Sequence, residues 1–406
     1  MKNFVYTRND YFATVAPFLG TPVIKVLTGM RRSGKSFLLR QILAQLRADG
    51  VPARNIVYVD KEDYAFDAIR DYHALAAHVD KALKGKRGRT VVCVDEVQEI
   101  EGWERIVASW SGKANREVFI TGSNASLLSS ELATLLAGRY IEFPVRPLSF
   151  AEFLQFREKP VAPDADEFQN YLRYGGLPGL HTLGTLSDET FRPYTQSIFD
   201  TIMLKDVVSR HQVRNMALLE RVARYVMDNT GNLLNASRIA AFMKNQRVSA
   251  SVDTILTQLH WFNDAHLTER ALLYDLKGKR HLEINEKHYL TDFGLKHAVL
   301  GWRAADIGGL LENIVFLELR RRGYTVSVGR FGDMEIDFVA ERNGERAYYQ
   351  VAYLLSSKET LEREVRSLLA VGDNYPKYLL SMDNLPADNP HGVARRYLPD
   401  WLLGAR

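Results

Sequence analysis

The chain has 406 residues, a length that predicts two to four domains. Hydrophobic residues make up 46% and charged residues 25%, as in an ordinary globular protein, which excludes a mostly disordered or low-complexity chain. The formal net charge of +4 is too small to indicate a nucleic-acid-binding protein by itself.

A single cysteine, Cys93, excludes an intrachain disulfide and a cysteine-based zinc site, and it is typical of a reducing compartment. Residues 1–10 carry charges and lack the apolar core of a signal peptide. No apolar run approaches the roughly 18 to 20 residues that a membrane span needs. We therefore expect a cytoplasmic protein that crosses no membrane.

The N-terminal part of the chain alternates strand-like and helix-like patterns. Residues 22–28 predict a strand that runs into a glycine-bearing turn, and Ser36–Leu46 predicts a helix with apolar residues at helical spacing. Further strands are predicted at residues 55–60, 90–95 and 117–121. Apolar strands separated by helices predict a buried parallel sheet, and so an α/β domain over residues 1–148.

The pattern turns helical after Pro147. A helical lid is predicted over residues 149–212, broken by the Gly-Gly-Leu-Pro-Gly stretch at 175–179. Helices followed by a short hairpin predict a winged-helix module over residues 213–300. A helix from Ile307 and three further strands predict a second α/β unit over the rest of the chain, 301–406. The strands are expected at residues 325–328, 335–340 and 347–353.

The clearest motif lies between the first predicted strand and helix, where residues 29–36 fit G-x-x-x-x-G-K-[ST]. In such a loop, backbone N–H groups close around phosphate oxygens and the helix N-terminus adds positive potential. Lys35 is expected to reach the β- and γ-phosphates, and Ser36 to ligate Mg²⁺. We therefore predict a site for ATP and Mg²⁺. Its residues are expected to be Gly29, Arg31, Arg32, Ser33, Gly34, Lys35, Ser36 and Phe37.

Residues 91–96 form an apolar strand that ends in two carboxylates, the Walker B pattern. Asp95 is expected to hold Mg²⁺ through water. Glu96 is expected to polarise the attacking water as general base. Two adjacent acids favour hydrolysis over binding alone.

Two further candidates for the catalytic site follow in the chain. The third strand ends in a polar cluster from which Asn124, or Ser123, could orient the attacking water. Arg139, after a helix predicted to end at Gly138, is a candidate for an arginine that stabilises transition-state charge across a subunit interface. Because an arginine at a helix C-terminus is also favoured by the helix macrodipole, a structural role for Arg139 stays open.

Several motifs together carry a family resemblance. In chain order they are GMRRSGKS, VDEVQ, ITGSN, LLAGRY, PLSFAEFL, YGGLPGL, LKDVV, LENIVFLELRRRGY, EIDFVA and YQVAY. They resemble the prokaryotic AAA-type ATPases that carry a C-terminal domain of unknown function, and they cover nearly the whole chain. The resemblance implies the AAA fold, ATP hydrolysis with Mg²⁺, and assembly into a homo-oligomer such as a hexameric ring.

Residues 235–259 predict a helix-turn-helix, and the hairpin at 272–282 predicts a wing beside it. The segment is similar to winged-helix modules attached to initiator-type AAA proteins, which implies duplex or branched DNA as a partner. Winged helices also dock proteins, so a protein partner is the alternative. Phosphate contacts are expected from Lys244, Arg247, Lys277, Lys279 and Arg280, and groove contacts from Ser251, Thr254 and Gln258.

The C-terminal segment resembles the restriction-endonuclease-like fold, whose pattern is a helix Glu, a strand Asp and then (D/E)-x-K. Glu312 and Asp337 fit the first two positions. The third strand reads Gln350-Val351-Ala352, so an amide replaces the acid and alanine replaces the lysine that would stabilise charge. We predict an inactive nuclease fold kept for DNA or subunit contacts, unless Glu335 or Lys358 compensates.

Together these features predict an oligomeric, Mg²⁺-dependent ATPase that binds or remodels DNA. The alternative is a nucleotide-dependent switch that recruits a protein partner and turns over slowly. Stimulation of ATP hydrolysis by DNA separates the two hypotheses. The sequence does not choose a second sensor arginine from the candidates Arg173, Arg210 and Arg214.

Overall fold

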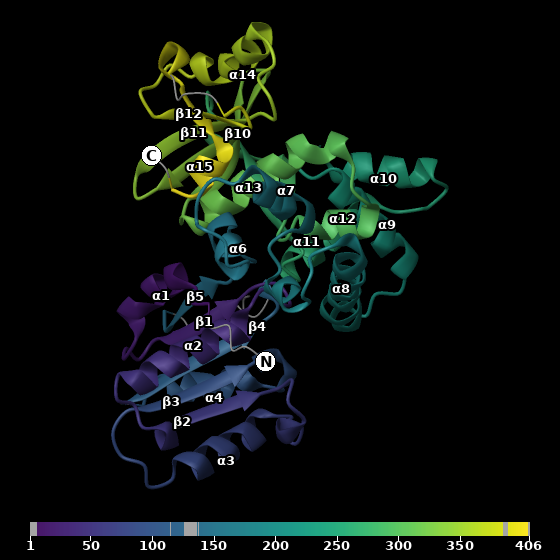
Figure 1. Cartoon of the computed structure of the whole chain (residues 1–406). Coiled ribbons are helices and arrows are strands. Elements are labelled where there is room, and N and C mark those ends of the chain that lie inside the picture. The colour runs from purple at the N-terminus through teal and green to yellow at the C-terminus, as the bar shows by residue number, and fades with distance from the viewer. Residues whose placement is uncertain (1–5, 114, 126–135, 137, 385–388, 405–406) are drawn as a thin grey trace. The chain divides into compact units, whose positions relative to one another are not determined.

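The computed structural model describes the chain except for residues 1–5, 114, 126–135, 137, 385–388 and 405–406. It divides into two compact units (Figure 1). The first comprises residues 1–146 with 264–266, and the second comprises 147–263 with 267–406. Each unit has a sheet and apolar cores of its own.

The first unit is built on a five-stranded parallel sheet in the order β2-β3-β4-β1-β5. Its strands are β1 (Ile24–Thr28), β2 (Ile56–Asp60), β3 (Thr90–Asp95), β4 (Arg116–Gly122) and β5 (Tyr140–Pro144). All residues of β1 are buried, as expected for a strand with both faces covered. The predicted α/β class with a parallel sheet is confirmed.

Helices cover both faces of this sheet (Figure 1). They are α1 (Asn9–Val15), α2 (Lys35–Ala48), α3 (Tyr72–Leu83) and α4 (Trp103–Trp110). Helices α1 and α2 share an apolar core with one face, and α3 and α4 share another with the opposite face. The loop between β1 and α2 therefore lies at the carboxyl edge of a rigid three-layer unit.

The second unit contains a mixed sheet of eight described strands in the order β13-β12-β11-β10-β9-β7-β8-β6. The bounds are β6 (Leu233–Leu234), β7 (Thr268–Asp275), β8 (Arg280–Leu290), β9 (Thr325–Phe331), β10 (Met334–Arg342), β11 (Glu345–Val351), β12 (Lys377–Ser381) and β13 (Ala394–Tyr397). This mixed sheet at the C-terminal end is consistent with the second α/β unit predicted there.

The hairpin of β7 and β8 belongs to the same sheet as the C-terminal strands. It is longer than the predicted wing, and β7 pairs in parallel with β9, so that Leu273 lies opposite Val328 and Asp275 opposite Arg330. Local sequence patterns give no signal for this pairing, because α12 (Gly294–Leu300) and α13 (Ile307–Arg321) separate the two strands along the chain. The domain boundary predicted at residue 300 therefore falls between strands of one continuous sheet.

The second unit also contains helices that precede, separate and follow these strands. Their bounds are α6 (Phe150–Phe156), α7 (Ala165–Tyr174), α8 (Asp188–Thr201), α9 (Met216–Asp228), α10 (Ala236–Asn245), α11 (Val252–Asp264), α14 (Lys358–Ala370) and α15 (Leu398–Leu402). Helix α8 continues into a π-helix at Ile202–Ser209. Helix α13 packs on one face of the sheet and α14 on the other. In the described ranges, no helix is both long and apolar enough to span a bilayer.

The glycine pair at 175–176, which interrupts the predicted lid, packs against the buried carboxylate of Asp292. Asp292 Oδ2 accepts the Gly176 N–H at 2.8 Å, and Asp292 Oδ1 accepts the Gly294 N–H at 2.9 Å. Gly175 has φ +79°, and a Cβ there would lie 2.2 Å from Asp292 Oδ1. Burial raises the pKa of Asp292 to about 7, against the lowering effect of its backbone hydrogen bonds. The glycines are required here by the close approach of Asp292.

Replacing Asp292 with asparagine is expected to flatten the pH dependence of stability. Because the folded-state pKa lies above the unfolded value of 3.8, the contribution of Asp292 to stability is full below pH 3.8 and is lost as pH rises through about 7. The slope is about 1.4 kcal/mol per pH unit, and Asp292→Asn lacks it. Thermal unfolding from pH 4 to 8 measures this. Asp164→Asn, at the N-cap of α7, is the control and should follow wild type. A parallel pH course for Asp292→Asn and wild type would contradict the expectation.

Candidate functional site

The loop between β1 and α2 is held tightly against the end of β5. Gly29 has φ +143°, and a Cβ there would lie 2.2 Å from the Val145 carbonyl oxygen. Lys35 begins α2, and its Nζ donates to the carbonyls of Gly29 at 3.0 Å and Met30 at 3.2 Å. Ser33 Oγ is buried without a hydrogen-bond partner among the described residues. The loop thus places a cation and a spare polar group at the carboxyl edge of the sheet.

Arg8, which the sequence gave no reason to single out, supports this loop from the N-terminal segment. Its side chain is 1% exposed and donates to the Ser33 carbonyl at 3.1 Å and the Arg146 carbonyl at 2.9 Å. Its guanidinium also lies 4.4 Å from the ring centroid of Tyr11, whose hydroxyl accepts the Arg146 N–H. The loop conformation is therefore fixed by a buried arginine on a separate helix end.

Asp95 ends β3 beside the loop and has a hydroxyl donor on each carboxylate oxygen. Tyr58 on β2 donates to Asp95 Oδ2 at 2.6 Å, and Thr121 on β4 donates to Asp95 Oδ1. The Thr121 hydroxyl also accepts the Glu96 N–H at 2.9 Å. Sequence reasoning did not assign a role to Tyr58 or Thr121. Thr121 lies in the polar end of a predicted strand, and this position is a signal that could have identified it; Tyr58 has no such signal.

Glu96 faces the loop lysine. It has φ +54°, and Glu96 Oε1 lies 3.4 Å from Lys35 Nζ. Its other oxygen accepts from Gln98 Nε2, which also donates to Ser123 Oγ at 3.3 Å. Although burial opposes ionisation, the Lys35 charge and the Gln98 hydrogen bond hold the pKa of Glu96 below its usual value. Glu96 is therefore a carboxylate at neutral pH and pairs with the cation that would contact phosphate.

The structure brings together most residues predicted for this site. Lys35, Asp95 and Glu96 share one polar network, while Ser123 and Asn124 are fully buried at the end of β4. Arg139 is exposed and lies at the other end of the sheet, where its carbonyl accepts the N–H of Ile24 at the start of β1. The helix predicted before Gly138 lies mostly outside the described residues.

These groups fit a nucleotide with Mg²⁺. A glycine-bearing loop at a helix N-terminus suits phosphate oxygens, and Lys35 adds a cation. Asp95 and Ser36 supply the hard oxygen ligands that Mg²⁺ prefers. Of the remaining candidates, Arg31 is half-buried and lies 3.9 Å from Glu62, whereas Arg32 and Phe37 are exposed and Gly34 has φ +100°.

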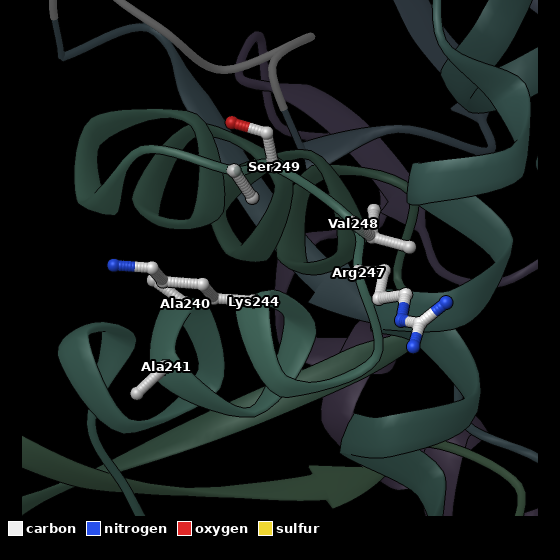
Figure 2. A pocket seen from close by; sticks show the side chains of 7 residues that line it. Ala240, Ala241, Lys244, Arg247, Val248 and Ser249 are labelled. Atoms are coloured by element: carbon white, nitrogen blue, oxygen red, sulfur yellow. The ribbon is translucent and has the colours of Figure 1, made fainter.

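The turn between α10 and α11 forms a hollow of about 400 Å³ (Figure 2). Its lining comprises Ala240, Ala241, Lys244, Arg247, Val248, Ser249 and Ala250. Lys244 and Arg247 are exposed, and neither forms an ion pair with the described residues. Figure 2 shows Lys244 projecting from α10 and Arg247 from the following turn. The hollow thus has two unpaired cations on its lining, as a phosphate contact requires.

One expected groove contact is wrong. Gln258 is 2% exposed on the inner face of α11, so it cannot face a DNA groove. Ser251 and Thr254 bond to each other at 2.8 Å, and Ser251 Oγ accepts the Thr254 N–H at 3.1 Å. The prediction placed Gln258 on the exposed face of the helix, but position 258 lies on the buried apolar stripe with Ile255 and Phe262.

The tip of the β7–β8 hairpin carries the other expected phosphate contacts. Lys277, Lys279 and Arg280 are all exposed. Lys277 Nζ lies 4.8 Å from the ring centroid of Phe331 at the end of β9. The tip is therefore anchored on the neighbouring strand while its cations remain at the surface.

The nuclease-like residues surround a lysine from an unexpected strand. Lys287 on β8 is 2% exposed, and its Nζ lies 2.8 Å from Glu312 Oε1 and 2.6 Å from Glu335 Oε1. Tyr289 donates to the same Glu312 oxygen at 2.5 Å. Sequence reasoning considered Glu335 and Lys358 as compensating residues but missed Lys287, because the pairing of β7 with β9 brings β8 into this sheet.

Lys287 acts as a built-in cation for these carboxylates. Although burial opposes its charge, Glu312, Asp337 and Glu335 raise the pKa of Lys287. Burial, and next the charge of Glu312, raise the pKa of Asp337 well above its usual value. Gln350 Oε1 accepts the Asp337 N–H at 3.3 Å, and Asp337 Oδ2 accepts the Val351 N–H. In the described part of the chain, no three His, Cys, Asp or Glu side chains are arranged to hold a metal ion.

Comparison with known proteins identifies relatives over the whole chain. A family model described as an AAA domain matches residues 21–154, and one described as a domain of unknown function, DUF8612, matches 165–306. An uncharacterised protein of Haemophilus influenzae is 36% identical and covers 99% of this chain and 100% of its own length. The uncharacterised protein MJ1544 of Methanocaldococcus jannaschii is 29% identical over 85% of this chain and 77% of its own length.

A solved structure shares the fold. The Walker-type ATPase PABY2304 of Pyrococcus abyssi matches with a TM-score of 0.52 and 15% identity. The match covers 74% of this chain and 97% of the Pyrococcus chain. At this identity, the likeness is one of fold.

Proposed function

This chain belongs to the AAA+ family of P-loop ATPases, and from that membership we propose that it hydrolyses ATP with Mg²⁺ as a homo-oligomer and couples hydrolysis to binding of duplex or branched DNA. The observation that carries the proposal is the network of Lys35, Glu96 and Asp95 at the carboxyl edge of the sheet. A P-loop lysine and a Walker B pair within one network are what phosphoryl transfer to water needs.

The residues of the site divide the work of hydrolysis. Lys35 moves from Glu96 to the β- and γ-phosphates when nucleotide binds, which frees the Glu96 carboxylate to accept a proton from water. Ser36 directly, and Asp95 through water, would hold Mg²⁺, which would supply positive charge beside the phosphates. Gln98 and Ser123 orient Glu96.

Oligomerisation is supported by the place of Arg139. It lies at the amino end of β5, whereas the phosphate loop follows the carboxyl end of β1, its parallel neighbour. Strands rise by roughly 3.3 Å per residue, so five residues of strand separate Arg139 from its own site. Arg139 is thus distant from its own phosphate loop, and we propose that it acts on the nucleotide of a neighbouring subunit.

DNA binding is supported by two groups of exposed cations in the second unit. Lys244 and Arg247 line the hollow of the helix-turn-helix, and Lys277, Lys279 and Arg280 form the hairpin tip. Exposed lysines and arginines suit contacts with phosphates. Gln258 is buried, so its amide is not available on α11 to hydrogen-bond with base edges. We expect binding that depends steeply on salt and weakly on sequence.

The proposal is tested by steady-state ATP hydrolysis with and without linear duplex, single-stranded and four-way-junction DNA, at low and physiological salt. We expect stimulation by duplex or branched DNA that weakens with salt, and Lys35→Ala is expected to abolish nucleotide binding and turnover. Arg54→Ala, at an exposed site after α2, is the control. Tight Mg·ATP binding by Lys35→Ala would contradict the P-loop assignment.

A nucleotide-dependent switch with a protein partner is the second candidate, and one observation favours it. The exposed face of the helix-turn-helix is partly apolar, with Leu256 52%, Phe242 42% and Val252 39% exposed. Where such side chains form one contiguous patch, they are typical of a protein-docking surface. Slow hydrolysis that no form of DNA changes would favour this candidate.

A further inference from the structure

Tyr58 is the residue whose contact with the catalytic network no motif explains. It lies on β2, outside the P-loop and the Walker B strand, and its hydroxyl is 2.6 Å from Asp95 Oδ2. In the parallel register Tyr58 pairs with Cys93 and Asp60 pairs with Asp95. The long tyrosine side chain thus reaches diagonally forward, toward the carboxyl edge, to meet the carboxylate two positions along the neighbouring strand.

We propose that Tyr58 is a positioning residue that orients Asp95 for Mg²⁺, which rests on the proposed ATPase function. Thr121 donates to Asp95 Oδ1 and Tyr58 donates to Oδ2, so the carboxylate cannot rotate without breaking one bond. A carboxylate offers about four lone-pair sites, so two remain for the waters around the metal. The two hydroxyls therefore fix the orientation of the Asp95 carboxylate and leave some of its lone pairs free for the waters around the metal.

The ring of Tyr58 is held in place by packing that does not involve its hydroxyl. It packs against the apolar core beneath α2 that contains Cys93, and the Arg40 guanidinium lies 5.9 Å from its ring centroid. Removal of the hydroxyl alone therefore keeps this packing and removes the donor to Asp95, together with the interaction of the hydroxyl with Arg40.

The test is Tyr58→Phe, which keeps the ring and loses the donor. Outer-shell partners of metal ligands contribute about 10- to 100-fold to metal affinity or activity. We expect the free Mg²⁺ concentration that gives half-maximal hydrolysis to rise about tenfold. ATP binding in EDTA should stay at the wild-type value, and saturating Mg²⁺ should restore most of kcat.

Tyr348→Phe is the matched control, because Tyr348 donates to Asp373 at the same 2.6 Å but lies on β11. It should leave the Mg²⁺ midpoint unchanged. An unchanged midpoint in Tyr58→Phe, in a wild-type background that hydrolyses ATP, would overturn this inference alone. Equal losses of ATP affinity with and without Mg²⁺ would also overturn it, because they indicate damage to the fold. A wild type that binds no ATP at any Mg²⁺ concentration would overturn the proposed function as well.

Discussion

Replacing Glu96 with glutamine is expected to lower kcat for ATP by roughly 10²- to 10⁴-fold, the contribution typical of a positioned general base. Nucleotide binding should be kept or strengthened, because Glu96 Oε1 lies 3.4 Å from Lys35 Nζ and competes with phosphate for that cation. Glutamine has nearly the same shape but carries no charge. The variant should therefore accumulate with ATP bound, which single-turnover hydrolysis and filter binding measure.

Glu99→Gln is the matched control for this experiment. Glu99 lies three residues along the chain, in the short helix Val97–Glu99 whose N-cap residue is Glu96, and it is exposed. The same chemical change there should leave kcat and ATP affinity near wild type. Hydrolysis at the wild-type rate by Glu96→Gln would show that another group accepts the proton. Loss of binding together with turnover would indicate that Glu96 is needed to shape the loop.

The pH dependence of this site follows from the same ion pair. Burial alone would raise the pKa of Glu96, but the Lys35 charge, the Gln98 hydrogen bond and weaker effects of Arg31 and Ser123 together hold the folded-state pKa below 4.5. Stability from this pair is therefore present above pH 4.5 and lost as pH falls through the lower folded-state value. Between pH 6 and 8 Glu96 remains ionised, so changes of ATPase rate in that range report other groups.

Local motifs predicted that Lys35, Asp95 and Glu96 lie close together, whereas the contacts that support them from other segments could not be predicted. The P-loop and the Walker B strand each lie on a few consecutive residues, so spacing alone placed Lys35, Asp95 and Glu96. Tyr58 and Arg8 come from other segments, and only the parallel register of β2 and β3 and the fold of the N-terminus bring them to the site. Such contacts leave no periodic or spaced pattern in a single sequence.

The same distinction explains what the sequence predicted in the second unit. The two helices of the helix-turn-helix and the strands β9 to β11 follow local patterns. The continuous sheet does not, because it depends on pairing between β7 and β9 across two helices. Gln258 was misassigned for a related reason. Which side of an amphipathic helix faces solvent is decided by its packing partners, and these are remote in the chain.

Replacing Lys287 with methionine is expected to destabilise the second unit by about 3 to 5 kcal/mol, since removal of one partner leaves buried carboxylates uncompensated. Lys287 is 2% exposed between Glu312 and Glu335, on three different elements of the unit. Calorimetric unfolding measures the loss. Lys358→Met is the control, because the Lys358 side chain is 84% exposed and its ion pair with Glu362 is 3.8 Å long, an arrangement that contributes less than about 1 kcal/mol.

A double variant tests whether the loss arises from the unpaired charge. Glu312→Gln combined with Lys287→Met removes the more buried of the two carboxylates that pair with Lys287, and should recover part of the lost stability. Added Mg²⁺ tests whether Glu312, Glu335 and Asp337 are neutralised by Lys287 or bind a metal ion. If Lys287 is the resident cation, Mg²⁺ leaves wild-type unfolding unchanged and DNA uncleaved. A rise in wild-type Tm with Mg²⁺, above any effect of nucleotide, would show that the carboxylates bind metal and that the prediction of an inactive nuclease fold is wrong.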